Sequence, residues 1–334
     1  MRRYHDVGGQ PGDPLTFTSH DFKPWEKLVT GLLSSLRARG IGNLDQMRRL
    51  VEDLPPEVYD RGYVECRAES VRGIIEEHGA ITHAEIDQRM AAIEKRLRGM
   101  EKSPSTKEKN HDHGHHHDHD HHHDHNEHGH PILTYADDSV HDQDDTSYYA
   151  LLAEAMRELA IEKGLIKATD IREHLEIQEG EDPELGPKVV ARAWTDPKFK
   201  KRLLENGRQA ILDEFGIDPS FADLIVLEND AAVHNLVVCT LCSCYPRNLL
   251  GQPPDWYKSK SYRARAVKEP RDVLRDFGLE VPAKTTIRVH DSNADMRYLV
   301  LPQRPKGSEG MSEADLAKLV TRDAMVGASL PKVG

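Results

Sequence analysis

Apolar residues recur at helical spacing through the first hundred positions of the chain. Thr82 and Glu85 have the spacing of a capping box, which marks the start of a helix. Residues 1–100 are therefore expected to form a helical domain behind an extended arm that ends near His20, where glycine and proline are frequent. The predicted helices cover residues 25–36, 44–54 and 56–79, and a fourth begins at Thr82.

This pattern gives way to a tract of histidine and aspartate. Residues 101–145 carry few apolar side chains, and most of the chain's 20 histidines lie between His111 and His130. A segment of this composition cannot bury a core, so we expect a disordered linker. Imidazole binds divalent cobalt, nickel and zinc, so the tract is either a store that delivers metal or a linker that binds metal incidentally.

Helical and strand patterns alternate in the remainder of the chain. We expect residues 146–334 to form a layered domain of helices and strands, which makes the fold class α+β. The predicted helices cover residues 150–163, 169–178 and 271–276, and further helices begin at Pro187, at Pro197 behind an Asp196 N-cap, and behind Ser312. The predicted strands cover residues 223–228, 235–239, 285–290 and 296–301.

Composition narrows the classes of function. The formal net charge of −12 argues against a nucleic-acid partner, because phosphate binding needs basic patches. No apolar run has the length of a signal peptide or of a membrane span. These features predict a soluble cytoplasmic protein.

Three of the four cysteines lie within six residues, in the loop from Cys239 to Cys244. Neighbours this close cannot join distant parts of a fold by disulfides, so metal binding or redox chemistry is favoured. Cys242, Ser243 and Cys244 can wrap one ion through two sulfurs and the backbone nitrogens of Ser243 and Cys244, while Cys239 supplies an axial sulfur. These five ligands leave a sixth position open, as a catalytic metal site requires.

The residues alone leave other uses of this loop open. Ionised amides and thiolates suit trivalent cobalt or iron better than zinc. A structural zinc site that recruits His234 or His290, or a redox dithiol of Cys239 and Cys242, is also compatible with the spacing. The lone Cys66 is expected to be a buried structural thiol.

The loop and its surroundings resemble the α subunit of the cobalt-type nitrile hydratases. The resemblance rests on residues 238–246 and 250–259 and on shorter stretches that reach residue 323, and Thr240 and Tyr245 are typical of the cobalt branch. It implies hydration of nitriles to amides at a low-spin, non-corrin Co(III) ion. The nucleophile is then either a sulfenate oxygen or a water molecule activated by the metal.

The resemblance also assigns the metal ligands. It implies that Cys239, Cys242, Ser243 and Cys244 hold the cobalt, with Cys242 oxidised to a sulfinate and Cys244 to a sulfenate. Such oxygenated sulfurs carry negative charge and need hydrogen-bond donors to hold them. No cofactor other than cobalt is implied, apart from divalent metal on the histidine tract.

Residues 5–9, 25–27 and 43–48 resemble the N-terminal region of the β subunit of the same enzymes. Arg48 matches an arginine that binds the oxidised sulfurs, so Cys244, Ser243 and Arg48 are the expected catalytic residues. The C-terminal barrel of the β subunit has no counterpart in this sequence. We therefore expect a separate chain to supply it, in a hetero-oligomer.

Two departures from the family pattern concern the substrate. Arg247 stands where many relatives have tryptophan, and Ser220 replaces a glutamine that approaches the substrate. Both changes predict larger or more polar nitriles. The alternative activity is thiocyanate hydrolysis, since thiocyanate hydrolase shares the cobalt loop and divides its β-like halves between chains. A cobalt-binding chaperone or activator is the alternative of another class, and it would leave the cysteines unoxidised.

Overall fold

The computed structural model describes residues 3–17, 22–101, 147–179, 184–219, 222–241, 243–293 and 295–333. The histidine tract, Ser220 and Cys242 lie outside these ranges, as does almost all of the expected linker. Helices and strands both occur, and the predicted α+β fold class is confirmed. Within the described residues, no helix combines the length and the apolar character that spanning a membrane demands.

The N-terminal helices follow the predicted pattern with one correction. The helix expected over residues 56–79 is divided in two, because Gly62 has φ +153° and interrupts the hydrogen-bonded turns. The break places Tyr59 and Tyr63 at the facing ends of separate helices. The elements are α1 (Pro24–Ala38), α2 (Leu44–Glu52), α3 (Pro56–Tyr59), α4 (Tyr63–His78) and α5 (His83–Glu101).

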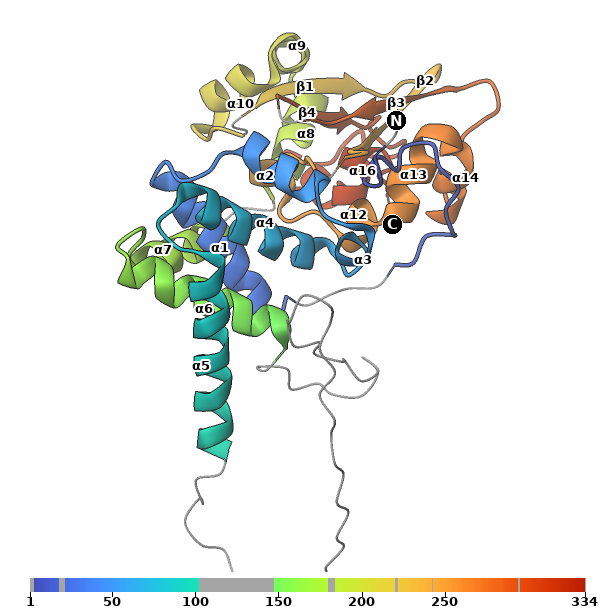
Figure 1. Ribbon diagram of the computed structural model, residues 1–334. Coiled ribbons are helices and arrows are strands. Elements are labelled where there is room, and N and C mark those ends of the chain that lie inside the picture. Colours follow the sequence, from blue (N-terminus) through green and yellow to red (C-terminus); the bar gives the residue numbers. More distant parts are fainter. Residues whose placement is uncertain are drawn as a thin grey trace, which may run out of the picture.

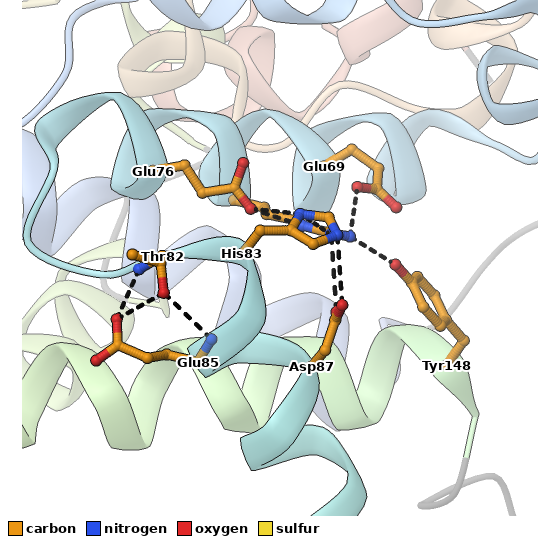
Figure 2. Close-up of polar contacts among 8 residues, drawn as sticks. Glu69, Glu76, Thr82, His83, Glu85, Asp87 and Tyr148 are labelled. Atoms are coloured by element: carbon orange, nitrogen blue, oxygen red, sulfur yellow. Dashed lines mark hydrogen bonds and ion pairs between the residues drawn. The ribbon is translucent and has the colours of Figure 1, made fainter. Parts of the chain in front are cut away.

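The predicted capping box at the start of α5 is confirmed. The backbone N–H of Thr82 donates to Glu85 Oε2 at 2.8 Å, and the Glu85 N–H donates to Thr82 Oγ1 at 3.3 Å (Figure 2). Beside it, Arg72 from α4 donates to Glu76 at 3.0 Å and to the Tyr148 hydroxyl at 2.9 Å. This polar junction joins α4 and α5 to the first helix that follows the histidine tract.

Two helices beyond the tract pack with the N-terminal helices. They are α6 (Tyr148–Glu162) and α7 (Ala168–Glu179), and their apolar side chains share one core with α1, α4 and α5. Ion pairs join Glu85 to Lys163 at 2.8 Å and Arg96 to Glu158 at 2.8 Å, so α5 and α6 run antiparallel. The boundary expected at residue 146 stays a prediction, but the packing unit around α1 extends past it.

The second core is built from helices around two pairs of parallel strands (Figure 1). The strands are β1 (Asp223–Glu228), β2 (Val233–Val238), β3 (Thr286–Asp291) and β4 (Met296–Leu301), with β1 beside β4 and β2 beside β3. The helices are α8 (Leu185–Thr195), α9 (Pro197–Glu205), α10 (Gly207–Phe215), α11 (Arg247–Leu250), α12 (Asp255–Lys258), α13 (Lys260–Lys268), α14 (Pro270–Asp276), α15 (Glu313–Lys318) and α16 (Arg322–Val326).

Residues recognised in the sequence mark the starts of several of these helices. Asp196 caps α9 by accepting from the Lys198 N–H at 2.8 Å, and Ser312 caps α15. Pro187 lies in the first turn of α8, which begins at Leu185, two residues before the predicted start at Pro187. The sequence does not predict α10, α11, α12, α13 or α16.

The N-terminal arm, residues 3–17, connects the helical unit (α1 to α7) to the second core. Gly9 donates its N–H to the carbonyl of Ala264 at 2.8 Å, and Arg265 donates to the carbonyl of Asp13 at 3.1 Å. The ring of Phe17 lies edge-on to Phe277, with 4.9 Å between centroids. The arm is extended, as predicted, and it runs along α13 and α14 (Figure 1).

A close approach at Gly327 offers a test of how tightly β2 is held. Gly327 ends α16 with φ +89°, and a Cβ there would lie 1.9 Å from the carbonyl oxygen of Asn235 in β2. We expect Gly327→Ala to lower the free energy of unfolding by about 3 kcal/mol or more. Gly307→Ala is the matched control, since Gly307 has φ +85° with no atom near its Cβ position.

Urea or thermal unfolding of both variants measures the difference. Because the control carries only the strain of the left-handed backbone, it should cost about 1 kcal/mol. If the free energy of unfolding fell equally in the two variants, the close approach of Gly327 to Asn235 would be contradicted.

Candidate metal centre and its cavity

The cysteine loop follows the strand β2 directly and is buried. Leu236, Val237 and Val238 are almost fully buried, and Cys239, which follows them, is 0% exposed. At the other end of the loop, Ser243 and Cys244 are 6% exposed. Three of the four predicted metal ligands are thus shielded from water, and the fourth, Cys242, lies outside the described residues.

The first half of the loop is anchored to β3. Val238 pairs with Asp291 in the parallel register, so the Asp291 carboxylate lies beside the residues that leave β2. One oxygen accepts from the Thr240 N–H at 2.9 Å, and the other accepts from the Thr240 hydroxyl at 2.5 Å. This pair of bonds fixes the turn immediately after Cys239.

A single buried arginine holds the loop carbonyls and the N-terminal unit together. Arg263 of α13 is 5% exposed, and its guanidinium donates to the carbonyls of Thr240 at 2.8 Å and Leu241 at 2.9 Å. The same Nη2 atom lies 2.9 Å from the Tyr59 hydroxyl and 3.5 Å from the His5 carbonyl, so its two N–H groups are shared among these acceptors. Charge-assisted bonds of this kind are about twice as strong as neutral ones, so Arg263 couples the loop to α3 and to the arm.

Two buried tyrosines support the strand and the far end of the loop. The Tyr257 hydroxyl donates to the Cys244 carbonyl at 2.9 Å, and the Tyr262 hydroxyl donates to the Val237 carbonyl at 2.6 Å. Burial raises the pKa of both phenols well above 10. They therefore remain neutral hydrogen-bond donors throughout the ordinary pH range.

A residue of the N-terminal unit touches the centre of the loop directly. Tyr63 and Ser243 share a hydrogen bond of 2.5 Å between their hydroxyl oxygens. Two cations flank the Tyr63 ring, Lys258 at 5.4 Å and Arg67 at 5.3 Å from its centroid. The break before α4 is what allows Tyr63 to point at Ser243 from the end of a helix.

A cavity of about 1270 Å³ is lined by residues of the N-terminal helices, such as Tyr63, and by residues of the second core, such as Arg263. Arg48 of α2 is on its wall, half-buried, together with Ser243 and Cys244. The Arg48 side chain forms no hydrogen bond or ion pair with the rest of the described chain. Eight Lys and Arg residues and five Asp and Glu residues line the cavity, so its wall carries a surplus of positive charge.

The described residues give no support to the structural zinc site. His234 Nε2 lies 2.7 Å from the Gly327 carbonyl, and His290 Nε2 lies 2.9 Å from Asn235 Oδ1. Both imidazoles therefore have partners away from the loop. In the parts of the chain that are described, no three His, Cys, Asp or Glu side chains gather as a metal site.

Cys66 is buried, as predicted, and behaves as a structural thiol. Its sulfur donates to the Tyr59 carbonyl at 3.4 Å. Burial is the main cause that raises the pKa of the Cys66 thiol to about 12. The thiol therefore stays protonated and unreactive near neutral pH.

Several residues that shape this site could not be identified from the sequence. Arg263 and Asp291 belong to no metal-ligand pattern, although a buried arginine in a short helix is a signal once its burial is known. Tyr63 lies outside the stretches 5–9, 25–27 and 43–48 that resemble the β subunit, so no motif pointed to its contact with Ser243.

Comparison with known proteins assigns both halves of the chain. A model of the nitrile hydratase alpha chain matches residues 147–329, and a model of the nitrile hydratase beta subunit N-terminal region matches residues 1–119. The low-molecular weight cobalt-containing nitrile hydratase subunit alpha of Rhodococcus rhodochrous is 50% identical over 185 residues, which cover 54% of this chain and 88% of that subunit.

Thiocyanate hydrolase also resembles this chain. The gamma subunit from Thiobacillus thioparus is 43% identical over 202 residues, which cover 57% of this chain and 83% of that subunit. A solved structure of recombinant thiocyanate hydrolase comprising partially-modified cobalt centers matches with TM-score 0.54 and 43% identity, covering 56% of this chain and 92% of that chain. The resemblance identified from the sequence, a β-like region fused to an α-like region, is confirmed.

The role of Arg263 can be tested without reference to activity. We expect Arg263→Met to lower the free energy of unfolding by about 3 kcal/mol, because buried loop carbonyls lose a charged donor. Amide hydrogen exchange in residues 239–244 should accelerate. Arg271→Met is the matched control, since Arg271 also donates to carbonyls, at Val281 for example, but away from the loop.

The control should leave exchange in residues 239–244 unaltered. If Arg263→Met likewise left this exchange unaltered, Arg263 would not be what holds the loop.

Proposed function

Because the chain belongs to the nitrile hydratase family, we propose that it binds one Co(III) ion in the loop from Cys239 to Cys244 and hydrates nitriles to amides. The names of its relatives support cobalt as the metal. The observation that carries the proposal is the position of the loop. It is buried at the end of β2, yet Ser243 and Cys244 open onto a large cavity that Arg48 also lines.

The donor chemistry of the loop fits a trivalent ion. The sulfurs of Cys239, Cys242 and Cys244 and the backbone nitrogens of Ser243 and Cys244 would hold it. When bound, such an ion with one open position supplies a Lewis acid for the nitrile or for water. Arg263, Asp291 and Tyr257 bind only backbone or threonine groups of the loop, so they fix its shape and leave the sulfurs to the metal.

Arg48 is proposed to bind the oxidised sulfurs of Cys242 and Cys244. Sulfinate and sulfenate groups carry negative charge, and a guanidinium that has no other partner among the described residues is suited to hold them in place. The hydrogen bond from Tyr63 orients the Ser243 hydroxyl beside the same groups. These residues position the reacting groups before the substrate arrives.

We infer that a separate chain completes the enzyme. The beta subunit match is to the N-terminal region of that subunit and ends at residue 119, and the alpha match begins at residue 147. A hetero-oligomer in which another polypeptide covers the cavity is consistent with its size of about 1270 Å³. The native complex should contain this second polypeptide.

Thiocyanate hydrolysis is the second candidate activity. Thiocyanate is an anion with a C≡N group, and the surplus of Lys and Arg on the cavity wall favours an anion. The likeness to the gamma subunit of thiocyanate hydrolase supports the same alternative.

Metal content and peptide mass test the proposal together. The complex purified after growth in cobalt should hold about one cobalt per chain, with two oxygens added to Cys242 and one to Cys244. Cys66 should remain unmodified and serves as an internal control, since its thiol stays protonated. Assays with a neutral nitrile and with thiocyanate then separate the two activities. Zinc with unmodified cysteines would reject the proposal.

Arg48 gives a second, independent test. We expect Arg48→Gln to lower kcat by about a hundredfold, because the oxidised sulfurs lose their counter-charge. Arg49→Gln is the matched control, since Arg49 is next in the helix but its guanidinium binds Glu77 at 2.6 Å on the exposed side. If kcat were unaffected in Arg48→Gln, Arg48 would not bind the oxidised sulfurs as proposed.

The histidine tract is proposed to deliver cobalt to the loop. Deletion of residues 111–130 should lower cobalt occupancy at limiting cobalt and leave it unaffected at excess cobalt, because a store matters only when metal is scarce. Metal analysis of protein grown at both concentrations measures this. Equal occupancy at limiting cobalt would leave the tract as a linker that binds metal incidentally.

A further inference from the structure

Two arginines from different units face the same cavity. Arg37 lies in the last turn of α1, and Arg247 begins α11, three positions after Cys244. Both line the cavity that contains Ser243 and Cys244. Within the described residues, neither side chain has a hydrogen bond or an acidic partner. The fold therefore places two guanidinium groups without a neutralising partner on the wall of one cavity.

Their proximity has an electrostatic cost. Partial removal from water lowers the pKa of Arg37, and the positive charge of Arg247 lowers it further. Arg37 nevertheless remains charged near neutral pH, because arginine deprotonates only far above it. Like charges without a counter-ion are unfavourable, so the arrangement favours an anion that bridges them.

The nearby carboxylates are already bound. Asp218, whose carbonyl accepts from Asn248 beside Arg247, has its carboxylate on Arg208 at 2.9 and 2.6 Å. Elsewhere on the cavity wall, Asp255 pairs with Lys258 at 2.7 Å. These ion pairs neutralise other cations and leave the charge of Arg37 and Arg247 uncompensated.

We propose that Arg37 and Arg247 form a subsite for the negative end of an anionic nitrile. The ligand class is a short aliphatic carboxylate whose C≡N group extends to the cysteine loop. A planar guanidinium binds a carboxylate through two parallel hydrogen bonds, and two such groups fix its orientation. This inference rests on the proposed function, since it assigns a substrate class to the same cavity.

Kinetics of the holoenzyme complex test the subsite with matched substrates. We choose 4-cyanobutanoate and its neutral methyl ester, with thiocyanate as a short anion. The ratio of kcat/KM for the carboxylate to that for the ester should fall about tenfold in Arg37→Gln and in Arg247→Gln. Arg37→Lys should restore part of the ratio, because it restores the charge without the planar fork.

Arg39→Gln is the matched control on the same helix. Arg39 binds Asp170 at 2.7 Å and does not line the cavity, so the ratio should stay at the wild-type value. Native mass of each variant complex shows whether the second chain still binds. Loss of that chain together with an unchanged ratio would assign the two arginines to the interface and overturn the subsite.

Calorimetric binding of 4-cyanobutanoate separates this inference from the proposed function. Binding that weakens about tenfold in Arg37→Gln, in a complex that hydrates no nitrile, would support the subsite and reject the activity. Equal loss of carboxylate and ester turnover, or a ratio unaffected in both arginine variants, would overturn the subsite. If kcat/KM relative to the ester fell for thiocyanate but not for 4-cyanobutanoate, the arginines would bind a small anion. That outcome would overturn the carboxylate class.

Discussion

The buried guanidinium of Arg263 is the interaction on which this architecture depends. It binds two carbonyls of the cysteine loop and the Tyr59 hydroxyl of the N-terminal unit. Placing a charge where it is 5% exposed costs free energy, and hydrogen bonds from its donors to nearby acceptors offset that cost. The loop, α3 and the arm supply those acceptors, so the geometry of the loop and the docking of the two units are set by the same group.

This coupling explains why two regions that match separate subunits can act within one chain. The β-like region contributes Arg48, Tyr63 and Arg37 to the cavity, and the α-like region contributes the cysteine loop and Arg247. The antiparallel pair of α5 and α6 adds a second attachment, through ion pairs such as that of Arg96 with Glu158. The α-like region thus meets its β-like partner at the cavity and also at the base of the helical unit.

Much of the fold could be predicted from the sequence. β1 and β4 have the predicted ends, because apolar residues make up most of each short run. The helix α13 could not be predicted, since its buried face includes Arg263 and Arg265 and shows no apolar stripe. The division at Gly62 was also hidden, because glycine at one position interrupts a pattern that otherwise continues from Pro56 to Gly79.

The candidate site was predictable to the extent that local spacing defines it. Three cysteines in six residues identify the loop, but the contact of Tyr63 with Ser243 joins residues 180 positions apart and needs the fold. X-ray absorption at the cobalt edge of the native complex tests the central claim most directly. We predict a six-coordinate, low-spin trivalent ion with sulfur and amide-nitrogen ligands. A tetrahedral ion, or a divalent ion bound only by imidazole and oxygen, would contradict this account.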